Sequence, residues 1–421
     1  MEADTSARPA HSEKLAHSGR KLRLGVAGMG RGFLVMLPTL SLHPRITVVA
    51  GMDPRAEARE RFTQDFGGHA YKSFEALCDD TDIEAVYIAS PHQFHREQVQ
   101  IAARRGKHIL VEKPMALTLD DCRAMTDAAN AAGVHLIVGH SHGFDAPVHR
   151  ARQLIQSGAF GRLRMISALN YTDFLYRPRR REELQTELGG GVVFSQGSHQ
   201  IDVVRTIANQ KAVAIRAYSG AWDPQRPTES AYSALLTFED GLAASLTYSG
   251  HAHFDSDELC GWIGETGKPK DRRGYGTARR LLSTITPGQE DILKRDRGYG
   301  GPKYTPPSFP DPGGAERTLH EHFGLLIASC DRADLRPGPH GVTIYGDEHT
   351  YLDPLEAPVV PRSEVIDELY AAAIQGKRPF HSGEWATANL EICLAILQSS
   401  QERREVLLLH QIKAIETREM V

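Results

Sequence analysis

The sequence predicts two domains: an α/β domain built on a doubly wound parallel sheet, then an α+β domain with an open, mainly antiparallel sheet. Over residues 21–143, short apolar strands alternate with helical segments, and each strand ends in glycine or polar residues. Beyond residue 157 the pattern shifts to strands joined by turns. The 421 residues are enough for two domains with a substantial core, so we divide the chain into 21–143 and 144–421.

Charge and apolar patterning exclude two classes of partner. The net charge of −4 gives no case for nucleic acid, and no apolar run is long enough to span a membrane. Residues 1–20 are polar throughout, so we expect a disordered tail and not a secretory signal. The five cysteines are too scattered for a zinc site or a disulfide framework, so we expect free thiols in a reducing cytoplasm. They are Cys78, Cys122, Cys260, Cys330 and Cys393.

A glycine-rich turn follows the first apolar strand, residues 22–27, and precedes a helical segment with Leu34, Leu37 and Leu40 on one face. Glycines between a strand and a helix let a pyrophosphate reach the backbone donors at the helix N-terminus, as in the Rossmann dinucleotide-binding fold. The third small residue lies at position 32 and not at 33, which leaves the packing of helix against strand open. The expected phosphate contacts are Gly28, Met29, Gly30 and Arg31.

An acidic residue closes the next strand. Residues 46–52 are apolar and end at Asp53, which follows Gly30 by 23 residues. A carboxylate there accepts hydrogen bonds from both ribose hydroxyls of the adenosine and repels a 2′-phosphate. We therefore expect NAD in preference to NADP, with Arg55 as a neighbour that softens the preference.

Two further strands deliver polar residues to the same edge of the sheet. Residues 85–89 lead to Ser90, Pro91, His92 and His95, and residues 108–111 lead to Glu112 and Lys113. Pro114 stiffens the turn just beyond the lysine, at the carboxyl end of a strand, where open α/β sheets bind ligands. The histidines at 92 and 95 share a helix face, but no acid or cysteine accompanies them, so we expect no metal.

The second domain carries another glycine motif. Gly189, Gly190 and Gly191 open a predicted helix on which Ser195, His199 and Asp202 share one face. Other expected elements are a hairpin of residues 233–238 and 242–248, a helix over 321–329, a strand over 341–346 and a final helix over 385–401. Residues 265–316 read as an insert, with a short helix at 279–282, that forms a lid, an arm or a disordered stretch.

The glycine turn, Glu112-Lys113-Pro114 and the motif from Gly189 to Asp202 occur in an order that resembles the Gfo/Idh/MocA family of nicotinamide-dependent oxidoreductases. The resemblance runs from about residue 21 to the C-terminus, interrupted by the insert. It implies that Lys113 and His199 are catalytic and that residues 90–95 lie beneath the cofactor, where the histidines cap a helix and line the nicotinamide pocket. It also implies a homo-oligomer, dimer or tetramer, formed through the open sheet, and we expect the C-terminal helix to pack back toward the first domain.

The chain departs from the family at two positions. Ser195 stands where the family has an acid, and an arginine expected near residues 140–145 is replaced by His142 or Gly143. Oxidation of a secondary alcohol requires loss of the hydroxyl proton as hydride leaves. Neutral His199, with an unperturbed pKa of ~6.5, can accept that proton. Lys113 can stabilise the developing alkoxide, or act as the base if burial lowers its pKa.

An arginine run, residues 177–181, precedes the triple glycine. Such a run is either a solvated helix end or a grip on an acidic substrate through Arg177 and Arg179. The segments 90–95, 176–180, 194–199 and 329–337 resemble phthalate 4,5-dihydrodiol dehydrogenases. That branch implies NAD-dependent oxidation of a carboxylated cis-dihydrodiol to a catechol, with rearomatisation as a driving force. Substrate contacts are then expected from Arg177, Arg179, Ser195, Gln196 and His142.

The sequence leaves three alternative functions open. A dehydrogenase of the same family acting on a sugar, inositol or another diol would not need the arginines. A non-catalytic NAD-binding sensor would explain the missing acid but would need neither Lys113 nor His199. A nicotinamide-dependent glycosidase would use transient oxidation and release a hydrolysed sugar.

Overall fold

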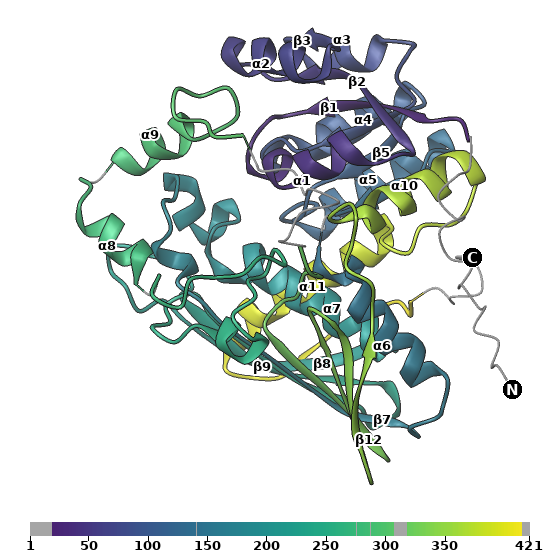
Figure 1. Ribbon diagram of the computed structural model, residues 1–421, viewed down its shortest axis with the longest axis vertical. Helices are drawn as coiled ribbons and strands as arrows, with labels where there is room; N and C mark the ends of the chain where they lie inside the picture. The colour runs from purple at the N-terminus through teal and green to yellow at the C-terminus, as the bar shows by residue number, and fades with distance from the viewer. Residues whose placement is uncertain (1–18, 140, 275, 287, 307–317, 415–421) are drawn as a thin grey trace, which may run out of the picture.

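The computed structural model describes residues 19–139, 141–274, 276–286, 288–306 and 318–414. Two sheets dominate the molecule, one in each domain, and helices lie between and around them (Figure 1). The predicted tail lies outside the described residues apart from its last two positions. Within the described part of the chain, no helix combines the length and the apolar character needed to cross a membrane.

The first sheet is parallel throughout and has the order β3-β2-β1-β4-β5-β6. Its strands are β1 Leu22–Ala27, β2 Ile46–Met52, β3 His69–Tyr71, β4 Ala85–Ile88, β5 His108–Val111 and β6 Leu136–Val138. The helices between them are α1 Arg31–Leu42, α2 Ala56–Phe66, α3 Phe74–Asp79, α4 His95–Arg104 and α5 Leu119–Ala132. The strand order reverses between β1 and β4, so their carboxyl ends border the crevice in which doubly wound folds bind ligands. The predicted α/β fold of this domain is confirmed.

The second sheet has nine strands in the order β14-β13-β12-β11-β7-β10-β9-β8-β15, and β7–β10 is its parallel pair. These strands are β7 Leu163–Tyr171, β8 Ala212–Gly220, β9 Ala231–Phe238, β10 Ala243–Ser249, β11 Leu325–Cys330, β12 Ala333–Gly338, β13 Gly341–Gly346, β14 Thr350–Pro354 and β15 Val406–Leu407. The predicted hairpin is β9–β10, with Thr237 opposite Ala243 across the turn. Leu236 and Leu246 point into the core from it, while Leu235 is half exposed on the other face.

Four helices join the two sheets into one structure. They are α6 Ala146–Gln156, α7 Ser198–Ala208, α10 Ser363–Gln375 and α11 Gly383–Glu402. Helix α10 packs Val365, Ile366 and Leu369 into the core of the first sheet, although it comes late in the chain. The predicted final helix is confirmed as α11, whose Leu390 and Cys393 are buried as expected.

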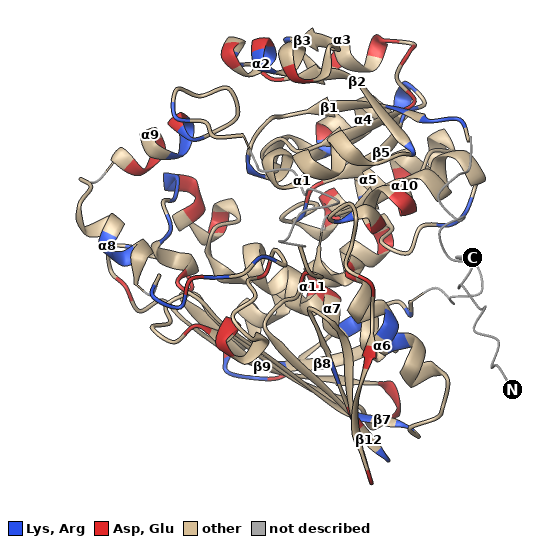
Figure 2. Cartoon of the chain, viewed as in Figure 1, with Lys and Arg blue, Asp and Glu red and all other residues tan. Residues whose placement is uncertain are grey.

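The insert forms an arm that carries α8 Thr277–Ser283 and α9 Gln289–Asp296, and α8 contains the short helix expected at 279–282. In Figure 1 the arm runs along one side of the molecule, from the nine-stranded sheet toward the first domain. Figure 2 shows basic residues on α8 and residues of both signs on α9. At its far end, fully buried Tyr299 packs edge-on against Phe33, with ring centroids 4.9 Å apart.

One predicted element is wrong. Residues 321–329, expected as a helix, contain β11, which pairs with β7 through Ala328 opposite Ile166. Leu326 and Ala328 point into the core while Leu325 and Ile327 are only partly buried, which is the alternation of a strand. A short apolar run of this length fits either structure, and pairing with a distant strand decides between them.

Candidate active site

The glycine turn after β1 has the shape that a pyrophosphate needs. Gly28 has φ +84°, and a Cβ there would lie 2.6 Å from the backbone nitrogen of Ser90. Helix α1 begins at Arg31, and its N-cap Gly30 provides no side-chain hydrogen bond. A Cβ on Gly30 would meet only the Ala89 oxygen, at 3.9 Å, so the approach to the helix N-terminus is open. These residues fit a dinucleotide phosphate.

The structure explains why the third small residue of the glycine turn lies at position 32 and not at 33. A Cβ on Gly32 would lie 2.9 Å from the carboxyl group of Glu112, at the end of β5. Helix α1 therefore approaches the sheet closely at position 32, and the adjacent Phe33 is fully buried. The carboxylate of Glu112 accepts a hydrogen bond from the hydroxyl of Tyr87.

The carboxylate of Asp53 is held by its own surroundings. It accepts hydrogen bonds from the Met29 backbone nitrogen at 2.8 Å and from Arg55 Nε at 2.9 Å. Arg55 also donates to the Met29 oxygen at 3.1 Å, so the pair fixes the glycine turn. A ribose at this strand end would therefore meet an Asp53–Arg55 ion pair, and not the free carboxylate that the sequence suggested.

The two histidines that follow β4 lie in different surroundings. His95 is buried at the start of α4, and its ring nitrogens lie 2.9 Å from the Ser90 oxygen and 3.2 Å from the Met115 oxygen. Through these two contacts His95 connects the segment after β4 with the segment after β5. His92 lies beside Gly189, where a Cβ would come within 2.9 Å of His92 Nε2, and burial lowers its pKa. Pro91 precedes His92, and the Ser90 hydroxyl contacts Gln98 Oε1 at 2.5 Å.

Lys113 links the two domains. Its Nζ donates a hydrogen bond to the main-chain oxygen of Ser195, at 2.6 Å. Burial lowers the pKa of Lys113 to about 8. Ser195 lies in a π-helical turn, Val193–Gly197, and its hydroxyl donates to the Gly191 oxygen. Such turns are frequent at functional sites, and this one also carries the partly exposed Gln196.

The rings of His199 and His142 lie next to each other. Their ring centroids are 5.0 Å apart, and the Phe323 ring lies 5.3 Å from His199. His142 Nδ1 is 2.7 Å from a carboxylate oxygen of Asp145. Burial lowers the pKa of His142 to about 4, so this imidazole is neutral at physiological pH.

Asp202 has partners of its own, although the sequence placed it on the helix face of His199. Its carboxylate accepts hydrogen bonds from Trp385 Nε1 at 2.5 Å, from Asn389 Nδ2 at 2.9 Å and from the Ser141 hydroxyl. It lines a cavity of about 30 Å³ that also borders Lys113. The aspartate thus anchors α7 to α11 and to the loop after β6.

The arginine run is split between two environments. Arg177 Nε lies 3.1 Å from Asp173, and the Arg177 side chain remains 44% exposed. Arg179 lies over the Phe174 ring at 3.5 Å and donates to the Phe174 oxygen at 2.7 Å. Burial, followed by repulsion from Arg177 and Arg362, lowers the pKa of Arg31. Arg31 and Arg177, from different domains, therefore lie close enough for their charges to interact.

Sequence reasoning missed Glu265, the first residue of the insert. Its Oε1 accepts a hydrogen bond from Asn170 Nδ2 at 2.9 Å. Although burial opposes the shift, Arg177 and then His142 lower the pKa of Glu265, so its carboxylate belongs to the same pocket. No motif surrounds this residue, and nothing in the local sequence marks it.

Comparisons with known proteins agree with this geometry. Residues 22–140 match the oxidoreductase family with an NAD-binding Rossmann fold, and residues 148–268 match the GFO/IDH/MocA C-terminal domain. A 1-carboxy-3-chloro-3,4-dihydroxycyclohexa-1,5-diene dehydrogenase from Comamonas testosteroni is 45% identical over 90% of this chain and 95% of its own. A candidate dehydrogenase from Bordetella bronchiseptica RB50 is 41% identical, with a TM-score of 0.85 over 92% of this chain and all of that one. A levoglucosan dehydrogenase in complex with NADH and levoglucosan, 17% identical with a TM-score of 0.67 over 92% of this chain and 99% of its own, shares the fold.

The fold and site define an oxidoreductase whose first domain binds NAD. The chain belongs to the Gfo/Idh/MocA family and is an NAD-dependent dehydrogenase of that family.

Proposed function

We propose that this enzyme oxidises a carboxylated cis-dihydrodiol of the phthalate 4,5-dihydrodiol type to the corresponding catechol. The observation that carries the proposal is the position of Arg177, which is partly exposed, near enough to Arg31 to repel it, and beside the same carboxylate, Glu265, as His142. A neutral diol needs no such cations, whereas a ring carboxylate pairs with a guanidinium fork. The Comamonas testosteroni relative, whose name describes a carboxylated dihydroxycyclohexadiene, supports the same substrate class.

We propose that His199 takes the proton of the reacting hydroxyl. Its ring shares the pocket with neutral His142 and with Phe323, which narrows the space around it. Lys113, bonded to the main chain of Ser195, donates to the same hydroxyl oxygen as negative charge develops. NAD, when bound, supplies the hydride acceptor. Loss of hydride and proton leaves a ketone that tautomerises to the aromatic catechol.

The remaining assignments concern binding. Gly28, Gly30 and the start of α1 are proposed to hold the pyrophosphate, and the Asp53–Arg55 pair the adenosine ribose. Arg179, Ser195 and Gln196 are proposed to line the substrate side, near Arg177. In this proposal Ser90, Pro91, His92, His95 and Glu112 form the floor beneath the cofactor.

The test is NADH formation by the purified protein with a panel of diols. The panel holds phthalate cis-4,5-dihydrodiol, benzoate cis-dihydrodiol, glucose and myo-inositol. We expect turnover of the carboxylated dihydrodiols alone. Turnover of glucose or myo-inositol alone would indicate a sugar or inositol dehydrogenase instead. NAD binding without turnover of any compound in the panel would favour a non-catalytic NAD-binding sensor.

We further propose a cytoplasmic homo-oligomer. All five cysteines are free thiols, as a reducing compartment requires. The second sheet carries Met165, Tyr218 and Leu235, which are 49%, 64% and 51% exposed, on the face away from the core. Apolar residues gathered on an open sheet favour burial against a second copy. Light scattering of the purified protein decides between monomer, dimer and tetramer.

A further inference from the structure

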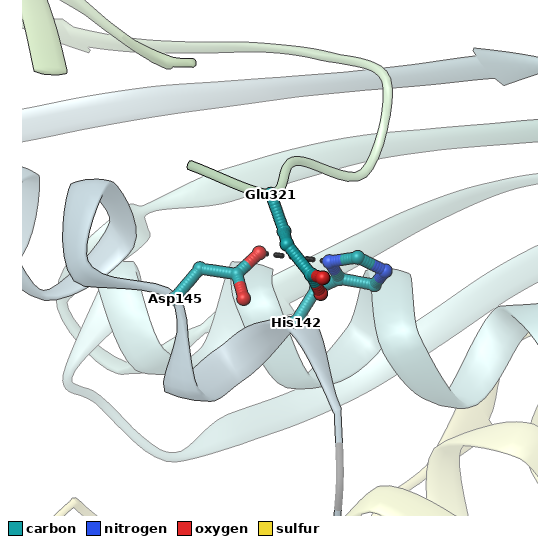
Figure 3. Close-up of side chains that lie close together, drawn as sticks. All are labelled: His142, Asp145 and Glu321. Atoms are coloured by element: carbon teal, nitrogen blue, oxygen red, sulfur yellow. Dashed lines mark hydrogen bonds and ion pairs between the residues drawn. The ribbon is translucent and has the colours of Figure 1, made fainter. Parts of the chain in front are cut away.

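His142 belongs to a buried cluster of side chains that could bind a metal ion. The cluster consists of His142, Asp145 and Glu321, and each offers one ligand atom within 4.8 Å of the others. Figure 3 shows Glu321 reaching in from a separate segment toward His142, whose ring nitrogen is bonded to Asp145. The three side chains are only 8%, 9% and 7% exposed. Residues from two distant parts of the chain thus converge on one buried point.

A cavity adjoins the cluster. Its volume is about 20 Å³, and its lining includes Asp145, Glu321, Arg362 and Glu364. A space of this size holds about one water molecule or one ion. A third carboxylate, that of Glu364, therefore faces the same small space as two of the cluster residues.

The cavity is lined by more acidic than basic side chains. The described lining residues include three carboxyl groups, the imidazole of His320 and one guanidinium, that of Arg362. Arg362 forms an ion pair with Glu321 and donates to the Val35 oxygen at 3.0 Å. A carboxylate has two oxygens with about four acceptor positions, so Glu321 can bind a cation while it keeps its ion pair with Arg362. Buried carboxylates are costly unless paired or bound to a metal.

We propose that His142, Asp145 and Glu321 bind a divalent cation of the Zn²⁺ or Mn²⁺ type, with Glu364 as a further oxygen donor across the cavity. One imidazole nitrogen with two or three carboxylates suits these ions, because imidazole favours zinc and carboxylates favour manganese. The cation replaces the proton shared by His142 Nδ1 and Asp145.

The ion has a positioning role in this arrangement. It fixes the ring of His142, which lies 5.0 Å from the ring of His199, while the second ring nitrogen of His142 points away from the cluster (Figure 3). Metal ligands of this kind hold a side chain in one orientation and one tautomer. The site thus departs from the expectation of no metal, and its existence does not depend on which diol is the substrate.

The test uses the full-length protein, freed of metal with a chelator and titrated with Zn²⁺ or Mn²⁺ in a calorimeter. We expect saturable binding of one ion per chain. Glu321→Gln and Asp145→Asn should each weaken it at least about tenfold, the lower end of the loss seen on removing even an outer-shell partner. Glu356→Gln is the matched control, since Glu356 is exposed on a neighbouring segment whose backbone oxygen contacts His320, and it should bind as the unaltered protein does.

Binding that is absent, or equally strong in all four proteins, would overturn the proposal. Circular dichroism shows whether each variant is folded. If a cluster variant unfolds, a Co²⁺ titration of the unaltered protein decides. Absorption bands of nitrogen- and oxygen-coordinated Co²⁺ support the site, and the spectrum of the aqueous ion overturns it. Because all readouts are of binding, a failure of the diol assay leaves this test intact.

Discussion

Lys113 donates a hydrogen bond to the main-chain oxygen of Ser195, across the junction of the two domains, at 2.6 Å. Ser195 stands where the family resemblance implies an acid. The lysine therefore keeps a partner at that position, but the partner is a neutral carbonyl and not a carboxylate. A neutral partner compensates the ammonium only weakly, which agrees with a pKa lowered by burial to about 8.

The first prediction concerns pH and Lys113. If its ammonium stabilises the alkoxide, kcat falls as pH rises through about 8, while neutral His199 is needed on the acid side of the profile. The measurement is a pH–rate profile with the best substrate of the panel. A rate that instead climbs through pH 8 would make Lys113 the base.

The second prediction concerns stability at the same residue. The pKa of Lys113 is about 8 when folded and near the ordinary 10.5 when unfolded, so the unfolded chain binds more protons between these values. Stability therefore gains from Lys113 as pH rises through this window, and the cost of its buried charge is full below pH 8. Lys113→Met should abolish this gain and raise the free energy of unfolding at pH 7. Urea denaturation at several pH values measures both effects.

The third prediction concerns the proton acceptor. His199→Ala should lower kcat by about 10²–10⁴-fold, the usual worth of a general base, and leave NAD affinity unchanged. His349→Ala is the control, since His349 is 84% exposed. Equal losses in both variants would point to a general effect of histidine removal.

The fourth prediction concerns substrate charge. Arg177→Gln should raise KM for a carboxylated dihydrodiol about 10- to 100-fold, because a charged hydrogen bond of about 1.5–3 kcal/mol is lost. Arg164→Gln, on an exposed ion pair with Asp331, should leave KM unchanged. An unchanged KM in Arg177→Gln would assign that arginine to its carboxylate partners, Asp173 and Glu265, and not to the substrate.

The fifth prediction concerns Glu265. Its carboxylate shares the pocket with Arg177, where it competes with an acidic substrate for the guanidinium. Glu265→Gln should therefore lower KM for carboxylated dihydrodiols and leave the affinity for an uncharged diol unchanged. Steady-state kinetics on benzoate and benzene cis-dihydrodiols compare the two. A higher KM for the acid would instead indicate that Glu265 orders the pocket.

The sequence correctly predicted elements whose conformation is determined by residues close together in the chain. The turn at residues 239–241 and its flanking alternation predict the β9–β10 hairpin, and the glycines at 28 and 30 predict a strand followed by a helix. The helix predicted for residues 321–329 was wrong because a short apolar run within nine residues does not distinguish a strand from a helix. The partner strand of this segment, β7, lies far away in the chain.

The site was predictable where residues follow strand ends. Lys113 follows β5 and contacts Ser195, and His142 follows β6 and lies beside His199, so both strand ends meet the segment from Ser195 to His199. Glu265 and Glu321 carry no local signal. They enter the pocket from the insert and from the segment after it, so only the folded chain brings them to His142.

The arm formed by the insert contacts both domains. Glu290 on α9 pairs with buried Arg226 at 2.8 Å and accepts from the Arg179 backbone, and beyond it Tyr299 donates to Asp65 at 2.8 Å. The arm therefore connects the two domains on this side of the molecule by contacts to each of them. A change in the relative position of the domains there has to break one of these contacts, so the arm makes their geometry depend on a segment outside both sheets.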